Sequence, residues 1–169
     1  DRLDLVLPGK GNIRQSIAKG AIPPARDRLG FEPMRSLFEM TAKQWAAESS
    51  GRYQWRNLKV LGIDGTTLRI PDSKENRETF GSHSGSAYPL IRLAGLIDLR
   101  SRLLVDYSFS GCRTGETTLA QELLPSIPDG SVTIMDRYFH NYSIWSAIHC
   151  EEKNRHWLVR GRDDLRVWK

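Results

Sequence analysis

Residues 59–73 read KVLGIDGTTLRIPDS, and the role of Asp64 in this stretch decides how the fold is interpreted. Two β-forming runs meet at Asp64 and Gly65, and Asp-Gly between such runs is the strongest short signal for a two-residue hairpin. The same letters are also typical of a strand that presents a carboxylate at its end. Side chains alternate along a strand, so Val60, Gly62 and Asp64 then share one face. This stretch alone leaves both interpretations open.

The same pattern recurs at residues 131–136, SVTIMD, where a short apolar run ends at Asp136. Asp at this position is typical of a helix cap, which is a purely structural role. Ligands, however, gather at the carboxyl ends of strands in α/β sheets. If residues 58–64 and 132–136 form parallel neighbouring strands, their axes lie about 4.8 Å apart. Two carboxylates at that spacing hold one divalent ion, or two ions about 3.5–4 Å apart. Oxygen ligands favour Mg²⁺ or Mn²⁺ over Zn²⁺.

The chain from Asn57 onward predicts an α/β fold. After the runs at 58–64 and 66–70 comes a loop, roughly 71–87, rich in Ser, Gly and charged residues. We expect strands at 88–98, 102–110, 131–135 and 156–161, and helices at 115–127 and 141–153. Thr114 is the expected cap of the first helix, whose leucines face inward. Three antiparallel strands followed by helix, strand, helix and strand predict a mixed sheet with helices on its faces.

The N-terminal third predicts a short helical region over residues 1–56. We expect a loop at 1–11, a short helix at 12–20, a break at 21–30 because of its two prolines, and a helix at 33–48.

The composition limits the class of protein. A chain of 169 residues with 39% hydrophobic residues suggests one domain, or one domain with a helical extension. No apolar run reaches the length of about 18 residues that a membrane-spanning helix needs. Two cysteines are too few for a disulfide framework, which favours reduced thiols in the cytosol. The net charge of +5 favours polyanion partners such as nucleic acid. We see no leader peptide, and we expect the chain to be part of a longer protein.

Four stretches of the chain resemble one family. They read LKVLGIDGTTLRIPD, LAGLIDLRSRLLVDYSFSG, TGETTLAQELLPSIPDGSVTIMDRYFHNYSIW and HWLVRGR. They are similar to the catalytic core of bacterial insertion-sequence DDE transposases, in the branch with a long insertion before the final glutamate. The resemblance covers about residues 57–163, and its most specific parts are the IDGTTL and MDRYFHNY blocks. It implies a ribonuclease H-like fold.

By this resemblance, Asp64 and Asp136 are the first and second acids of a catalytic triad that holds two Mg²⁺ or Mn²⁺ ions. The family's third acid is a Glu in a Tyr-x2-Arg-x3-Glu-x6-Lys block, and no such block occurs before Lys169. We therefore expect residues 57–169 to be a catalytic core truncated before the third acid, and inactive alone. By family position, residues 1–56 would be the end of a DNA-binding region.

The resemblance also implies DNA as the partner. The expected enzyme cuts DNA at the transposon ends and transfers the freed strand to a target, acting as a homodimer. We expect it in the bacterial cytoplasm, associated with the nucleoid and not with a membrane. Arg137, beside the second acid, is the foremost expected phosphate contact. Arg113, Arg160 and Arg162 are further ones, with a solvated basic rim as an equal alternative for each.

Other polar groups suggest no separate site. Asp72 and Asp98 fit turn positions, and Asp106 fits a solvent-facing strand position. The stretch 111–118, GCRTGETT, fails as a phosphate loop because Glu116 replaces the required lysine. The His and Cys residues of HCEEKNRH lack a second pair at zinc-ligand spacing.

Two other functions remain open. A truncated, catalytically inactive DNA-binding remnant would keep the fold and the basic surface. A ribonuclease H-like nuclease would cut strands without transferring them.

Overall fold

The computed structural model describes residues 2–6, 14–49, 54–83 and 86–161. Contacts divide the chain into two compact units, Asp1–Thr41 and Ala42–Lys169. The five-stranded sheet lies in the second unit. This division falls earlier than residue 57, where the sequence changes from helical to β-forming character.

The N-terminal unit begins with a hairpin rather than with a loop and a helix. Strands β1 (Arg2–Val6) and β2 (Arg14–Ala18) pair antiparallel. The expected loop at 1–11 and helix at 12–20 are therefore wrong over the described residues. In RLDLV, apolar and polar residues alternate with the period of two that a strand requires, and this signal was missed.

A short 3-10 helix and two α-helices follow the hairpin. The short η1 (Lys19–Ala21) leads into α1 (Ile22–Leu29), and α2 (Glu32–Ser49) comes next. The break expected at 21–30 is wrong, because both prolines fall in the first turn of α1. The missing amide hydrogens cost nothing there, since that turn has no intrahelical acceptors for them. The helix expected at 33–48 is confirmed as α2.

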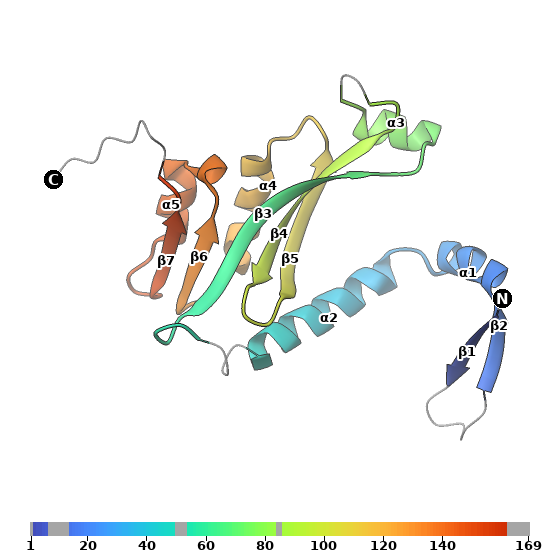
Figure 1. Cartoon of the computed structure of the whole chain (residues 1–169), viewed down its shortest axis with the longest axis horizontal. Helices are drawn as coiled ribbons and strands as arrows, with labels where there is room; N and C mark the ends of the chain where they lie inside the picture. Colours follow the sequence, from blue (N-terminus) through green and yellow to red (C-terminus); the bar gives the residue numbers. More distant parts are fainter. Residues whose placement is uncertain (1, 7–13, 50–53, 84–85, 162–169) are drawn as a thin grey trace. The chain divides into compact units, whose positions relative to one another are not determined.

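The second unit holds the expected mixed sheet. Its strands are β3 (Lys59–Arg69), β4 (Leu90–Asp98), β5 (Leu103–Gly111), β6 (Ser131–Met135) and β7 (Arg155–Val159). Their order is β5-β4-β3-β6-β7 (Figure 1). The first three in the chain are antiparallel, whereas β6 and β7 run parallel to β3. This α/β topology is the ribonuclease H-like arrangement that the sequence predicts.

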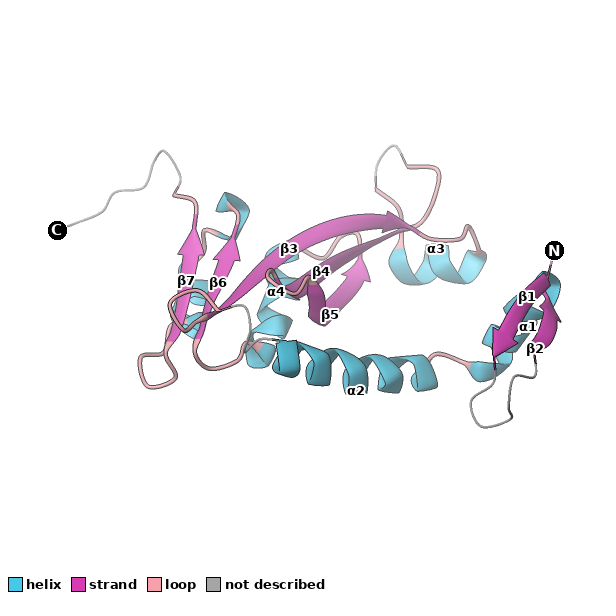
Figure 2. Cartoon of the chain, turned by 60° about the horizontal axis from the view of Figure 1, so that its bottom comes forward, coloured by secondary structure: helices cyan, strands magenta, loops and turns pink. Residues whose placement is uncertain are grey.

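Strand β3 runs straight through Asp64 and Gly65, so the hairpin interpretation of this dipeptide is wrong. Figures 1 and 2 show β3 as one long curved strand, and β4 pairs with it from Leu61 to Arg69. A type I′ turn needs positive φ at both central residues. Neither Asp64 nor Gly65 has positive φ. Pairing with β4 along its length therefore outweighs the local turn preference.

The core lies between the sheet and the helices α4 (Glu116–Leu123) and α5 (Tyr142–Ile148), which cover one face (Figure 1). The short helices η2 (Leu124–Ser126) and η3 (Arg137–Phe139) continue this layer. The buried side chains form one cluster: Leu61, Ile63, Ala94, Leu96, Leu119, Ala120, Leu123, Ile127, Met135, Phe139, Ile144 and Ile148. The cluster thus joins the inward-facing residues of β3, β4 and β6 to those of the helices.

Two local predictions are wrong. The expected loop at 71–87 contains α3 (Lys74–Phe80), whose cap is Ser73; the Asn76 amide donates to the Ser73 hydroxyl. The cap of α4 is Gly115, which makes no side-chain capping bond. Thr114 bonds instead to the Ser110 hydroxyl on β5.

Within the described part of the chain, every helix is too short or too polar to cross a membrane.

Candidate active site

The sheet brings Asp64 and Asp136 to the same level on neighbouring strands. Strands β3 and β6 are parallel, and their last paired residues are Ile63 and Met135. The next residue in each segment is the aspartate: Asp64 continues β3, and Asp136 directly follows β6. Neighbouring strands lie about 4.8 Å apart. The parallel pairing that the sequence analysis required is therefore confirmed.

Both aspartates are exposed, and one oxygen of each is held by a nearby amide. The Gly65 N–H donates to Asp64 Oδ1 at 2.8 Å, and the Tyr138 N–H donates to Asp136 Oδ1 at 2.8 Å. Asp136 thereby caps η3, so the structural role suggested for it is also present. The second oxygen, Oδ2, of each carboxylate accepts no hydrogen bond from the described residues. The local bonds fix each carboxylate and leave one oxygen available.

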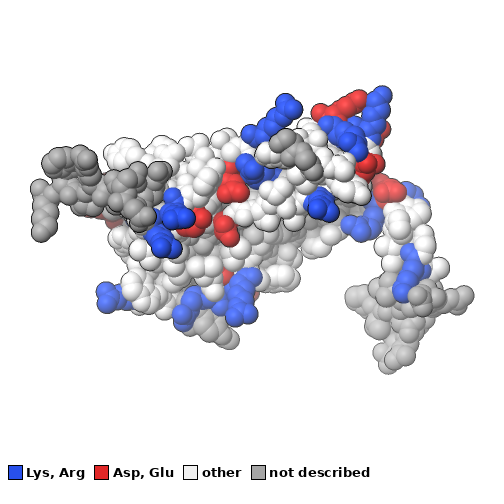
Figure 3. Space-filling model, turned by 45° about the horizontal axis from the view of Figure 1, so that its top comes forward, with Lys and Arg blue, Asp and Glu red and all other residues white. Residues whose placement is uncertain are grey.

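This donor set fits a hard divalent cation. Mg²⁺ typically binds one or two protein carboxylates and keeps several water molecules. Among the residues that the structure describes, no group of three or more His, Cys, Asp or Glu side chains can hold a metal ion. Asp64 and Asp136 therefore offer two carboxylate ligands. Viewed from the side toward which β6 and β7 point, acidic side chains gather in the middle of the surface with basic ones around them (Figure 3).

Comparison with known proteins decides the family. The family model described as "Transposase DDE domain" matches residues 55–169. The chain belongs to the DDE transposase family. In this DDE domain, Asp64 lies on β3 and Asp136 directly follows β6, the strand paired with it.

Two Escherichia coli (strain K12) proteins are similar to this DDE domain chain. "Putative transposase InsZ" is 36% identical over 163 residues, covering 94% of this chain and 54% of that protein. "Transposase InsG for insertion sequence element IS4" is 32% identical over 163 residues, covering 94% of this chain and 36% of that protein. The chain thus spans about half the length of the first relative and about a third of the second.

A solved structure also aligns with the chain. It is the cryo-EM structure of the piggyBac transposase synaptic complex with hairpin DNA. The alignment covers 90% of this chain and 32% of the piggyBac transposase chain. The TM-score is 0.46 and the sequence identity is 16%.

The arginines suggested as DNA contacts differ in their place relative to the two acids. Arg137 follows Asp136 directly and is exposed. Arg160 is level with Asp136, because Val159 and Met135 are the last pair between β7 and β6, and it is also exposed. Arg113 follows the end of β5, beyond the part of the sheet that is level with Asp64. Arg162 lies outside the described residues.

The other aspartates have structural partners. Asp98 is buried, and its Oδ1 accepts the amides of Arg100 (2.9 Å) and Ser101 (3.0 Å), which confirms a turn role. Asp72 pairs with Arg77; the hydrogen bond from this guanidinium lowers the pKa of Asp72.

Asp106 is half-buried and accepts a hydrogen bond from the Ser126 hydroxyl, so the solvent-facing position predicted for it is wrong.

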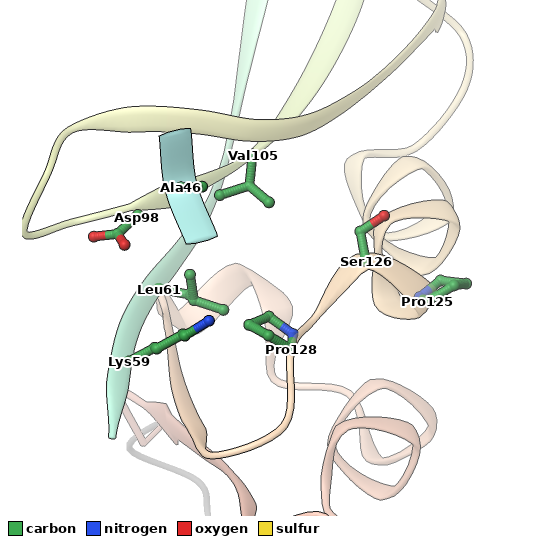
Figure 4. Close-up of a pocket in the computed structure, with 8 residues that line it drawn as sticks. All are labelled: Ala46, Lys59, Leu61, Asp98, Val105, Pro125, Ser126 and Pro128. Atoms are coloured by element: carbon green, nitrogen blue, oxygen red, sulfur yellow. The ribbon is translucent and has the colours of Figure 1, made fainter. Parts of the chain in front are cut away.

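A cavity of about 310 Å³ lies near the start of β3 (Figure 4). Its lining includes Lys59 at the start of β3, Asp98 at the end of β4, and Pro125 and Pro128 before β6. Neither Asp64 nor Asp136 lines this cavity, so it does not belong to the candidate active site.

One contact at the site was missed from the sequence. The side chain of Glu116 packs against Gly65, next to Asp64, and Arg92 faces Glu116. A glycine inside a strand often marks a close approach by another group. That signal was available once Gly65 was placed in a strand rather than in a turn.

Proposed function

We propose that this chain carries the first two acids of a DDE transposase active site, and that the protein containing it catalyses DNA strand cleavage and transfer during transposition of an insertion sequence. The observation that supports this most directly is the register of β3 and β6, which brings Asp64 and Asp136 level. Family membership supports the reaction class. The third acid would come from chain beyond residue 169, as the family resemblance implies.

Asp64 and Asp136 would hold Mg²⁺ or Mn²⁺, with two ions expected in the complete site. Divalent ions bound there supply Lewis-acid stabilisation of the charge on the attacking and leaving oxygens of a phosphodiester. The residues of this chain contribute orientation. Each Oδ1 is held by a backbone amide, so each Oδ2 has a defined direction without input from the ligand. Such preorganisation lowers the reorganisation that the reaction requires.

DNA is the proposed substrate, as transposon ends and as target. Arg137 and Arg160 lie beside and level with the second acid, so they would contact phosphates next to the cleaved bond. Arg113 and Arg162 would contact the backbone further away. The protein would act as a homodimer that joins two transposon ends. It would work in the cytoplasm, associated with the nucleoid. Residues 1–56 would be the end of a DNA-binding region, and 57–169 the catalytic core.

The test is cleavage of DNA that carries both ends of the encoding element, by the complete natural protein that contains this chain, with Mg²⁺ present. We expect Asp64→Asn and Asp136→Asn each to abolish cleavage while binding of the ends is largely retained, because each change removes one ligand charge and little volume. Glu151→Gln is the matched control, since Glu151 is an exposed acid before β7. Cleavage by either Asp variant at the parent rate would refute the assignment.

The same assay separates the other two functions. Binding without cleavage by the parent protein would identify an inactive DNA-binding remnant. Cleavage without joining of the freed strand to a target would identify a nuclease.

A further inference from the structure

The side chain of Glu116 closely approaches Gly65 of β3. A Cβ atom at residue 65 would lie 2.7 Å from Cδ and 2.8 Å from Cγ of Glu116. The φ angle of Gly65 is not positive, so the backbone conformation does not require glycine. The side chain of Glu116, the first residue of α4, occupies the space beside Gly65, so a larger residue at position 65 would displace it.

Glu116 is in turn held by Arg92 on β4. Arg92 Nε lies 4.0 Å from Glu116 Oε1, and the two side chains are 21% and 27% exposed. The Arg92 guanidinium also donates to the Thr114 carbonyl at 3.0 Å, which ties the segment before α4 to the sheet. Nε of Arg92 is buried and has no hydrogen-bond acceptor. The Glu116 carboxylate thus places negative charge 4.0 Å from this buried donor without hydrogen-bonding to it.

Gly65 connects this pair to the candidate active site. Its amide is the group that donates to Asp64 Oδ1. The contacts thus form a series: Arg92 holds Glu116, Glu116 packs against Gly65, and Gly65 orients the first acid. Helix α4 does not need Glu116 to pack on the sheet, because Leu119, Ala120 and Leu123 are buried there.

We propose that Glu116 is a positioning residue for Asp64. Packed against Gly65 and paired with Arg92, it keeps the Gly65 amide in place, so that Asp64 Oδ2 is presented beside Asp136. The proposal rests on the function proposed above, because it assumes that these two carboxylates bind a divalent cation. Residues that orient metal ligands typically change metal affinity about 10–100-fold when they are replaced.

The test measures Mn²⁺ affinity of the 169-residue chain by electron paramagnetic resonance of free Mn²⁺, together with thermal unfolding. We expect Glu116→Ala to weaken Mn²⁺ binding about tenfold or more, and Glu116→Gln, which keeps the shape but loses the charge, to weaken it less. Glu122→Gln is the matched control. Glu122 is on the same helix, and its carboxylate accepts a hydrogen bond from Ser108 at 2.5 Å, away from Gly65. A purely structural role would lower the melting temperature of Glu116 and Glu122 variants alike and leave Mn²⁺ affinity unchanged.

A double substitution sharpens the result. Gly65→Ala displaces Glu116, so it should weaken Mn²⁺ binding by itself, and adding Glu116→Ala should produce little further loss. Losses that add, or unchanged affinity in both Glu116 variants, would overturn the positioning role. Asp64→Asn distinguishes that outcome from a failure of the proposed function. If it abolishes Mn²⁺ binding while the Glu116 variants bind normally, only the positioning role is wrong; if it also leaves binding unchanged, the metal site itself is refuted.

Discussion

Replacing Phe139 with alanine should destabilise the fold beside the second acid. Phe139 is 1% exposed and three residues after Asp136, in the short helix that Asp136 caps. Its ring lies edge-on to Tyr138 at 6.1 Å, whereas its carbonyl accepts the Trp145 indole N–H at 3.1 Å. The backbone bond survives the substitution, so the cost comes from the lost ring and the cavity.

The expected loss is about 3–5 kcal/mol, the range for removing a fully buried Phe side chain. Small domains are typically stable by about 5–15 kcal/mol, so this is a large fraction of the total. At about 2–4 °C per kcal/mol for a chain of this size, the melting temperature should fall by roughly 6–20 °C. Phe139→Leu should cost less, because it refills most of the volume.

Urea unfolding followed by circular dichroism measures these changes in the 169-residue chain. The matched control is Tyr138→Ala, because this neighbouring aromatic side chain is 59% exposed. Exposed substitutions usually change stability by about 0.5 kcal/mol or less. Equal losses for the two variants would show that Phe139 does not anchor this segment in the core, and the account of how Asp136 is held would then be wrong.

Three further predictions follow from single contacts. Arg137→Ala and Arg160→Ala should each weaken DNA binding to all sequences and reduce the slope of log affinity against log salt by about 1; an unchanged slope in a filter-binding titration would exclude a phosphate contact. Asp72→Asn should remove part of the acid sensitivity of folding. The pKa of Asp72 is lowered by its bond from Arg77, so the pair stabilises the fold above the unfolded-state pKa and loses this effect as pH falls through the lowered pKa. The effect should be small because the pair is on the surface, and melting curves of the parent and Asp72→Asn below pH 4 test it. Ser73→Ala should cost about 0.5–2 kcal/mol by removing the α3 cap, whereas Ser73→Asp should restore most of it in the same unfolding assay.

The pattern of residues was enough to predict most elements of the second unit. The runs at 88–98, 102–110 and 131–135 are β-forming and end in turn residues, and all three are strands in the structure. Leu119 and Leu123, four residues apart, predicted the buried side of α4. These signals are local. They indicate which side chains face the core, but not which other residues form that core.

Short-range sequence signals predicted the wrong element where the local residues fit two different secondary structures. RLDLV is short, and its strand period competes with the turn signals of the proline and glycines that follow it. Pro23 and Pro24 predict a break in the chain, but in the structure they lie in the first turn of α1. In the candidate site, the sequence singled out Asp64 and Asp136 but not Arg92 or Glu116, since nothing near these two in the chain marks their contact with Gly65.

The sequence by itself determined that the chain from residue 57 onward is a mixed α/β unit, with most of its strands and helices in this order, and that apolar strand residues lead directly to Asp64 and Asp136. Tertiary structure alone decided that Asp-Gly continues a strand, that β3 lies between β4 and β6, and that a glutamate from α4 fills the space beside Gly65. The physical reason is the distance along the chain over which each effect acts. Periodicity and turn preference act over a few neighbouring residues, whereas strand pairing and close packing depend on groups tens of residues apart.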